Sequence, residues 1–203
     1  MYAPVFQGIV CVDRLLGIVT AGAFTADNKT DFSVQLQQAK DAGADLVFLP
    51  IYYNEAALIL KQASDMGFDV KFFGCDGLDG ILGVENFDAS LAEDVMLLTP
   101  FAADATDDLT VKFVTTYNEK FGETPNQFAA DGYDAIYIIK AAAEKAGITA
   151  DMSNEEICTA LSTAMTEIQV DGLTGLGITW DASGEPTKDP KAVVIKNGVY
   201  TAM

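Results

Sequence analysis

Short apolar runs alternate with amphipathic stretches over the first half of the chain. Each amphipathic stretch repeats its apolar residues every three or four positions, which is typical of a helix that buries one face. The expected helices are Asp31–Ala42 and Asn54–Met66, and the expected strands are Ile18–Phe24, Asp45–Pro50, Val70–Gly74 and Asp94–Pro100. This alternation predicts an α/β fold with a mainly parallel sheet flanked by helices.

The pattern changes near Thr99, where helical segments follow one another until strand signals return near Thr174. The expected helices are Thr106–Phe121, a helix from Pro125 or Asn126 to Ala146, and Asn154–Met165, and the expected strands are Gly175–Trp180, Ala192–Lys196 and Val199–Ala202. The last two strands flank Asn197-Gly198, the signature of a type I′ hairpin turn. The change from strands to helices and back predicts two lobes joined by more than one crossing of the chain.

Three helices begin at recognisable capping residues. Thr30 and Asn54 are the expected N-caps of the first two helices, because their side-chain oxygens can accept hydrogen bonds from the first turn. Ser153 and Glu156 have the spacing of a capping box at the start of the last helix.

The N-terminal region does not fit the βαβ pattern. Gly8–Val12 has the composition of a strand, yet only Asp13–Gly17 separate it from the strand that begins at Ile18. A parallel crossover needs about a dozen residues or more. Three alternatives remain: the two strands pair antiparallel, the N-terminal segment lies elsewhere, or a helix is missing here.

Two neighbouring strand ends carry polar and aromatic residues. Tyr52 and Tyr53 follow the strand that ends at Pro50, and Asp76 follows the strand that ends at Gly74. Both strands of a βαβ unit run in the same direction, so these residues emerge at the carboxyl edge of the sheet, where ligands of open α/β sheets bind.

This combination of side chains suits an amine ligand such as an α-amino acid. A carboxylate forms charge-assisted hydrogen bonds with an ammonium group, and a tyrosine supplies an apolar wall or a cation-binding face. The simpler alternative is that the tyrosines are a packing pair and that Asp76 is a turn residue. The convergence of Tyr52, Tyr53 and Asp76 on one edge favours the ligand-binding interpretation.

Composition excludes several classes of function. The formal charge is −18, from 12 basic and 30 acidic residues, which argues against partners with anionic surfaces, so we expect neither nucleic-acid nor membrane binding. The chain has no histidine, which excludes catalysis that depends on histidine, and its three cysteines have no CxxC spacing. The N-terminus carries acidic Asp13 and lacks a basic region, so no signal peptide is expected in this chain.

The remaining motifs are weak. The glycine-rich segments 77–83 and 172–177 lack the dinucleotide-binding spacing, and we expect a short helix or loop in the first and a hinge or tight chain crossing in the second. Asp107 and its acidic neighbours lack EF-hand spacing and are expected at a solvated helix start. Cys75 has no basic neighbour to activate it. The sequence therefore predicts a protein that is not an enzyme and that uses no cofactor or metal.

Three segments carry a resemblance to a known family: TADNKTDFSVQLQQAKDAGADLVFLPIYYNEAALILKQASDMGFDVKFFGCDGLDG, FVTTYNEKFGETPNQFAADGYDAIYIIKAAAEKAG and GLTGLGITWDASGEPTKDPKAVVIKNGVY. They closely resemble the type I extracytoplasmic solute-binding proteins of ABC transporters, in the leucine/isoleucine/valine-binding branch, over roughly Ile18 to Tyr200. The resemblance implies a type I periplasmic-binding-protein architecture, two α/β lobes that close around an amino acid, an ABC transporter permease as partner, and a location in the periplasm or at the cell surface.

The resemblance also assigns segments and residues. It implies that residues 18–98 belong to the second lobe, that residues 99–173 are a helical portion of the first lobe, and that residues 174–203 return to the second lobe, with residues 1–17 as an atypical N-terminal segment. Tyr52 matches a tyrosine that contacts ligand in the family, and Asp76 falls where the family has the acidic residue that binds the ligand's ammonium group. Tyr53 is carried as a neighbour.

The departures from the family define two hypotheses. A full member is nearly twice as long, and most of the first lobe, which holds the ligand carboxylate, is not recognisable here. We therefore expect a truncated or rearranged binding component with a half-site, and weak affinity because closure between two lobes is lost. The alternative is an engineered, split or remnant lobe that self-associates, with homo-oligomers forming through helices left exposed between Thr106 and Ala146.

Overall fold

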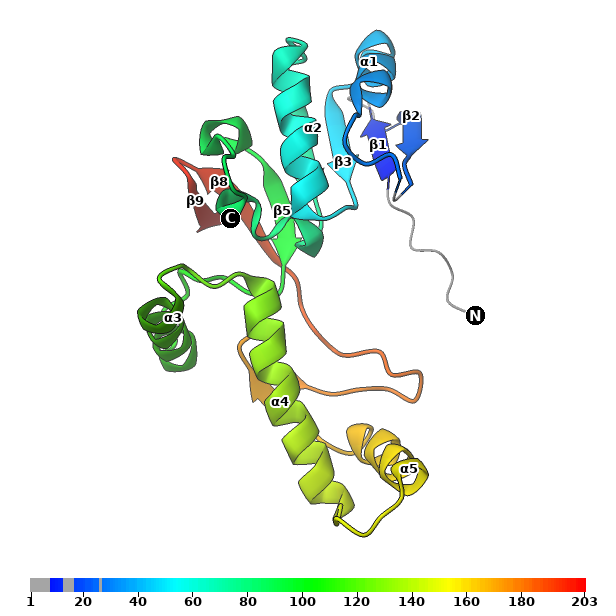
Figure 1. The fold of residues 1–203 in the computed structure, drawn as a ribbon, viewed down its shortest axis with the longest axis vertical. Coiled ribbons are helices and arrows are strands. Elements are labelled where there is room, and N and C mark those ends of the chain that lie inside the picture. Colours follow the sequence, from blue (N-terminus) through cyan, green and yellow to red (C-terminus); the bar gives the residue numbers. More distant parts are fainter. Residues whose placement is uncertain (1–7, 13–16, 26) are drawn as a thin grey trace. The chain divides into compact units, whose positions relative to one another are not determined.

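The computed structural model describes residues 8–12, 17–25 and 27–203 (Figure 1). The chain forms two compact units. Unit 1 contains the residues up to Thr99 together with Ala192–Met203, and unit 2 contains Pro100–Lys191. The lobe boundaries implied by the family resemblance remain predictions, because they refer to a longer two-lobed fold.

Unit 1 is built on a mixed sheet. Its strands in the described part of the chain are β1 (Gly8–Val12), β2 (Ile18–Ala23), β3 (Leu46–Leu49), β4 (Lys71–Gly74), β5 (Met96–Thr99), β8 (Lys191–Lys196) and β9 (Val199–Ala202). Their order is β2-β1-β3-β4-β5-β8-β9. β4 pairs parallel with both β3 and β5, whereas the β1–β2 and β8–β9 pairs are antiparallel. The predicted α/β class is confirmed, with a parallel centre and antiparallel edges.

The N-terminal strands follow the first of the three alternatives. β1 lies between β2 and β3 and pairs antiparallel with both, and the β1–β2 register shifts between Cys11 and Val12. Antiparallel strands need only a short connection, which removes the conflict over the five residues between them.

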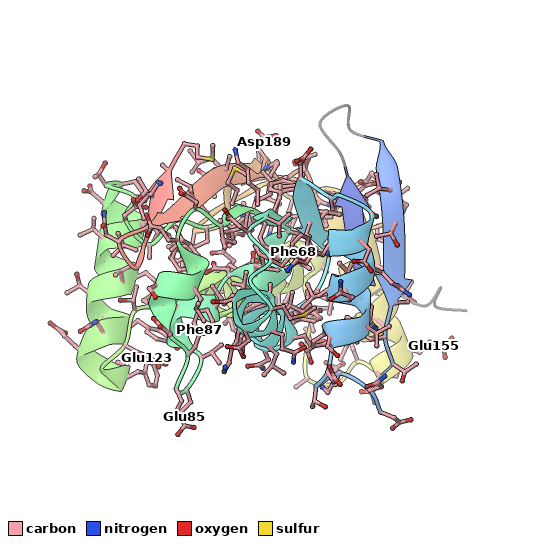
Figure 2. All side chains as sticks on the ribbon, turned by 90° about the horizontal axis from the view of Figure 1, so that it is seen from above. Phe68, Glu85, Phe87, Glu123, Glu155 and Asp189 are labelled. Atoms are coloured by element: carbon pink, nitrogen blue, oxygen red, sulfur yellow. The ribbon has the colours of Figure 1, made fainter. Side chains whose placement is uncertain are left out.

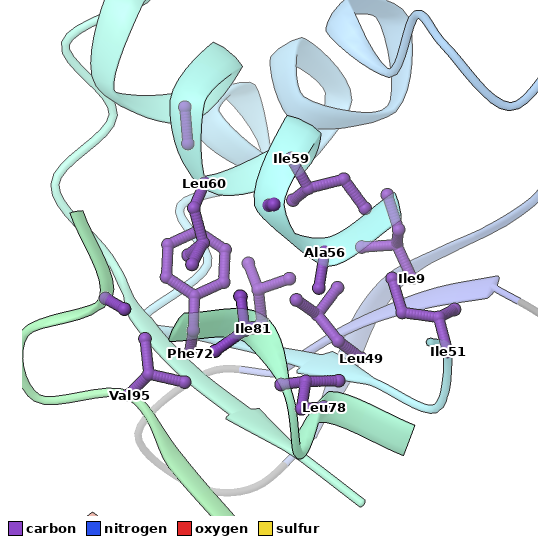
Figure 3. Packing of buried hydrophobic residues seen from close by; sticks show 14 of the residues in the cluster. Ile9, Leu49, Ile51, Ala56, Ile59, Leu60, Phe72, Leu78, Ile81 and Val95 are labelled. Atoms are coloured by element: carbon purple, nitrogen blue, oxygen red, sulfur yellow. The ribbon is translucent and has the colours of Figure 1, made fainter. Parts of the chain in front are cut away.

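The core of unit 1 lies between this sheet and two helices. These are α1 (Ser33–Asp41) and α2 (Tyr53–Asp65), and three short 3₁₀ helices follow: η1 (Asp76–Leu78), η2 (Ile81–Gly83) and η3 (Ala89–Ala92). Figure 3 shows Ile59 and Leu60 of α2 directed toward Leu49 and Phe72 of the sheet, and all four side chains are buried. Residues 77–83 thus form short helices after a strand, as predicted.

The predicted N-caps of α1 and α2 are wrong. α1 begins at Ser33, whose N–H donates to Asp31 Oδ1 at 3.0 Å, and the N–H of Phe32 donates to Gln62 Oε1 of α2 at 2.8 Å. Neither hydrogen bond involves the side chain of Thr30. α2 begins at Tyr53, because Tyr52 is extended and its carbonyl already accepts from the N–H of Ala56 at 3.1 Å. Asn54 therefore lies within the helix.

Unit 2 is mainly helical. Its described elements are α3 (Asp108–Phe121), α4 (Gln127–Ala146), α5 (Asn154–Met165), β6 (Val170–Gly172) and β7 (Gly175–Ile178). The Asp107 and Asn126 side chains cap α3 and α4, and the capping box of Ser153 and Glu156 is confirmed at α5. β6 and β7 form an antiparallel pair. The sequence did not predict β6, which is three residues long and ends in glycine.

A buried carboxylate connects helix α4 with the β6–β7 hairpin of unit 2. Asp134 of α4 accepts hydrogen bonds from the N–H groups of Leu173 and Thr174 at 2.8 and 2.9 Å and from the Thr174 hydroxyl at 2.7 Å. A side chain at Gly172 would meet this carboxylate at 2.5 Å. Gly172 therefore permits close approach of the β6–β7 hairpin to α4.

Many side chains of unit 2 remain accessible to solvent. Among the described residues its buried apolar cluster consists of Phe101, Ala130 and Leu173, with partly buried neighbours on α3 and α4. Ile136 and Ile139 of α4 are 67% and 55% exposed. Acidic side chains are also exposed on both units, and Figure 2 labels Glu85 of unit 1 and Asp189 of unit 2 as examples.

Candidate functional site

The carboxyl ends of β3 and β4 lie side by side in unit 1. Leu49 pairs with Gly74 at the last step of this parallel ladder. The chain continues through Ile51 and Tyr52 into α2 on one side, and through Asp76 into η1 on the other. The topology therefore brings the predicted residues to one edge of the sheet.

The two segments touch each other at a glycine. Gly77 is buried, and a Cβ atom there would overlap the carbonyl oxygen of Ile51 and lie 3.5 Å from the Cα of Tyr52. Asp76 is the residue immediately before this contact. The backbones that carry Tyr52 and Asp76 are thus in direct van der Waals contact.

The three predicted residues differ in exposure. The Tyr52 side chain is 52% exposed, and Asp76 is exposed as well. Tyr53 is partly buried against the core of unit 1, as expected of a packing residue. Tyr52 and Asp76 are accessible to a ligand, whereas Tyr53 contributes mainly to the support of α2. The binding role of all three remains a prediction.

A second polar group lies behind this edge. Asp79 and Thr99 are 5% and 2% exposed, and the Thr99 hydroxyl donates to the Asp79 carboxylate at 3.4 Å. The N–H of Gly80 donates to the hydroxyl of Tyr200 at 2.9 Å. The pKa of the Tyr200 hydroxyl lies well above its usual range, chiefly because the group is buried and also because the charge of Asp79 is near. Sequence reasoning missed these residues, although the repeated aspartate and glycine in Asp76-Gly-Leu-Asp79-Gly were a visible signal.

The neighbouring thiol is not activated. Burial raises the pKa of Cys75, and the nearby charge of Asp76 raises it further. Because the thiolate is the nucleophilic form, Cys75 is a weak nucleophile at neutral pH.

Two surface hollows lie in unit 2, away from this edge. One of about 800 Å³ lies between α4 and α5 and is lined by residues such as Lys145 and Thr159. Another of about 360 Å³ lies beside Tyr133 and Asp171. Neither is lined by the predicted site residues, so the edge at Tyr52 and Asp76 is an open surface of unit 1 and not part of either hollow. Over the ranges that the structure describes, no helix has the length and apolarity to cross a membrane, and no group of acidic or thiol side chains could hold a metal ion.

Helices and a sheet with a parallel centre make unit 1 an α/β domain, and Tyr52 and Asp76 lie at the edge of the sheet where ligands of such folds bind. The chain belongs to the periplasmic binding protein family, whose sequence profile matches residues 15–198. The predicted resemblance to the leucine/isoleucine/valine branch is confirmed by its relatives.

Relatives from this branch occur among both the sequence matches and the solved structures. The Leu/Ile/Val-binding protein homolog 1 of Brucella abortus is 29% identical over 120 residues, covering 58% of this chain and 31% of that protein. The leucine-binding protein LivK of Thermotoga maritima superposes with a TM-score of 0.72 at 28% identity, over 89% of this chain and 50% of that one. LivJ of Streptococcus pneumoniae, solved with isoleucine, gives a TM-score of 0.71 at 28% identity, over 88% and 49%.

These comparisons also show how much of each relative the chain covers. The chain spans about half the length of the solved relatives that it matches. The architecture of the family is therefore present over that half.

Proposed function

We propose that unit 1 forms the ammonium-binding wall of an amino-acid site, and that the protein is a non-catalytic solute-binding component of an ABC importer for branched-chain or related amino acids. The observation that carries the proposal is the contact of Gly77 with Ile51 and Tyr52, which holds Asp76 beside Tyr52. The names of the relatives, which specify leucine, isoleucine and valine, support the choice of ligand.

Each residue has a distinct role in this proposal. The carboxylate of Asp76 accepts hydrogen bonds from the α-ammonium group of the amino acid, and the charge on both partners strengthens those bonds. The ring of Tyr52 packs against the aliphatic part of the ligand, and Tyr53 holds the start of α2 in place. The exposure of Tyr52 and Asp76 supports these roles.

The proposal includes the setting of the protein. Members of the family are periplasmic or extracytoplasmic, and we place this protein there, delivering its amino acid to the permease of the transporter. The ligand carboxylate is not assigned to any residue here. A site with one assigned wall binds weakly, because the ligand is neither enclosed nor oriented from a second side.

Calorimetric titration with leucine, isoleucine and valine at millimolar concentration tests the proposal. We expect saturable weak binding that Asp76→Ala abolishes, because removal of the carboxylate leaves the ammonium group without its charged partner. Equal binding by the wild type and Asp76→Ala would refute the assignment of the site, and the absence of saturable binding would refute the function.

A second candidate function is self-association without appreciable ligand binding, as an engineered, split or remnant lobe. The exposure of Ile136, Tyr137 and Ile139 on α4, at 67%, 52% and 55%, favours it, because contiguous exposed apolar surface marks interaction sites. Light scattering separates the candidates: a monomer at high concentration would contradict self-association.

A further inference from the structure

The segment that carries Asp76 is held in place by packing and by backbone hydrogen bonds. Leu78 is fully buried, and its methyl groups fill the space that a side chain at Gly74 would need. Within η1, the N–H of Asp79 donates to the carbonyl of Asp76 at 3.0 Å. The position of Asp76 therefore depends directly on where Asp79 and Gly80 are held.

Gly80 is held by the last strand of the sheet. Its N–H donates to the Tyr200 hydroxyl at 2.9 Å, and Tyr200 lies on β9 opposite Ile195 of β8. Gly80 has a left-handed backbone with φ of 106°, which glycine adopts without strain. This hydrogen bond spans 120 positions of the sequence and connects the C-terminal hairpin to the segment that follows β4.

The neighbours of Tyr200 keep its hydroxyl protonated. Burial and the carboxylate of Asp79 both raise the pKa of Tyr200, and Asp79 itself accepts from Thr99 at the end of β5. A neutral phenol with a fixed ring is a well-placed acceptor for a backbone N–H. The side chains of Asp79, Thr99 and Tyr200 thus form a support behind the exposed edge.

We infer that Tyr200 is a positioning residue for Asp76: by accepting the hydrogen bond of Gly80, it sets the geometry with which the Asp76 carboxylate meets a ligand amine. This inference rests on the proposed function in one respect, the identity of the ligand group that Asp76 binds. The structural half, that Tyr200 holds the segment of Asp76, is independent of any ligand.

The ligand-free test uses amide hydrogen exchange and ¹⁵N chemical shifts of the whole chain. Tyr200→Phe removes only the hydroxyl. We expect faster exchange at Gly80 and shifted amide signals at Asp76 and Asp79. The control is Ile59→Val, a small core deletion in α2 that lowers stability and leaves both partners of the Gly80–Tyr200 hydrogen bond in place. Unchanged signals at Asp76 in Tyr200→Phe, or equal changes in both variants, would overturn the inference.

The ligand test compares leucine with 4-methylpentanoate, which is leucine without its amino group. The ratio of the two affinities isolates the contribution of the ammonium group. We expect Tyr200→Phe to lower this ratio by about threefold to tenfold, the effect of one lost hydrogen bond, while Ile59→Val leaves it unchanged. In the Asp76→Asn background, Tyr200→Phe should have no further effect, because both changes act on the same interaction.

The results of these experiments distinguish the proposed function from the positioning role of Tyr200. If the wild type does not prefer leucine, or if Asp76→Asn leaves the ratio unchanged, the proposed function fails, and the ligand-free test still decides the role of Tyr200. If Asp76→Asn lowers the ratio but Tyr200→Phe does not, or if the two effects are additive, the positioning role is refuted while the proposed function stands.

Discussion

At the scale of single residues, Gly77 shows that a glycine can be required by space alone. Its backbone is not left-handed, yet a Cβ atom would overlap the carbonyl oxygen of Ile51. The neighbouring glycine Gly83 has nothing within 4 Å of the same position. A side chain therefore has room at Gly83 but not at Gly77.

Gly77→Ala should destabilise unit 1 by about 1–3 kcal/mol, the usual cost of an overpacked contact. The added methyl group must push the segment of Asp76 away from Tyr52, because the clash is with backbone and not with a flexible side chain. Urea unfolding of Gly77→Ala and of the matched control Gly83→Ala measures the difference. A loss of stability in the control as large as that in Gly77→Ala would contradict this interpretation.

Tyr200 makes the stability of unit 1 dependent on pH in the alkaline range. Its pKa is raised in the folded chain, so the folded state holds the phenolic proton more tightly than the unfolded state does. The resulting stability is fully present below the unfolded pKa of about 10 and is lost as the pH rises above that value.

We expect the free energy of unfolding to fall more steeply between about pH 10 and pH 11.5 in the wild type than in Tyr200→Phe. Denaturant unfolding followed by circular dichroism at several pH values measures both slopes. Other tyrosines and lysines titrate in both proteins, so the difference between the slopes reports on Tyr200. Equal slopes would show that the phenol is not held in its protonated form.

At the scale of elements, the Gln62 side chain connects α2 to the start of α1. Gln62 of α2 accepts from the N–H of Phe32 at 2.8 Å and donates to the carbonyl of Thr30 at 2.9 Å. Gln62 thus bonds one backbone N–H and one backbone carbonyl of the segment that leads into α1. The start of α1 therefore depends on α2.

Gln62→Ala should cost about 1–3 kcal/mol, the range for loss of two hydrogen bonds of about 0.5–1.5 kcal/mol each, and should increase amide exchange at Phe32. The control is Gln37→Ala, whose amide group donates to Asp41 on the exposed face of α1. Increased exchange at Phe32 in the control, or none in Gln62→Ala, would show that the start of α1 is stabilised in another way.

A feature could be predicted from the sequence where the residues that form it are close together in the chain. The capping box at Ser153 was predictable because both partners lie three residues apart. The Asn197-Gly198 turn was predictable because its left-handed backbone depends on residue type, and both residues have positive φ. The starts of α1 and α2 were not, because the first residue of each helix depends on the backbone of the residue before it and not on a side-chain cap. The bond from Phe32 to Gln62 also forms only after the two helices pack.

Part of the candidate site could likewise be predicted from the sequence, and part could not. The rule for parallel strands placed Tyr52 and Asp76 on one edge, and the structure brings their backbones together there. The support from Tyr200 was not predictable, because it needs β9 to return to the sheet 120 positions after Gly80. Local patterns therefore located the exposed residues but not the buried ones behind them.

At the scale of the whole molecule, two opposing features act on association. The chain carries a formal charge of −18, which opposes the approach of a second copy. The exposed apolar side chains of α4 favour it. Salt screens the first effect and leaves the second in place.

Self-association through α4 should accordingly increase with ionic strength. Light scattering at 20 mM and 500 mM sodium chloride, about a Debye length of 20 Å and of 4 Å, should give a higher mean mass at the higher salt. Ile136→Glu places a charge in the middle of the exposed face and should remove the increase. Val199→Glu, on β9 of unit 1, is the control. The same mass at both salt concentrations would contradict association through this surface.

The central claim is that Asp76 binds the ammonium group of an amino acid. Calorimetry with leucine on the wild type, Asp76→Asn and Asp69→Asn tests it most directly, because both variants remove one exposed carboxylate, one after β4 and one before it. We predict that Asp76→Asn lowers the leucine affinity at least about tenfold, the effect of a lost charge-assisted hydrogen bond, while Asp69→Asn binds as the wild type does. Equal affinities for the two variants would contradict the claim.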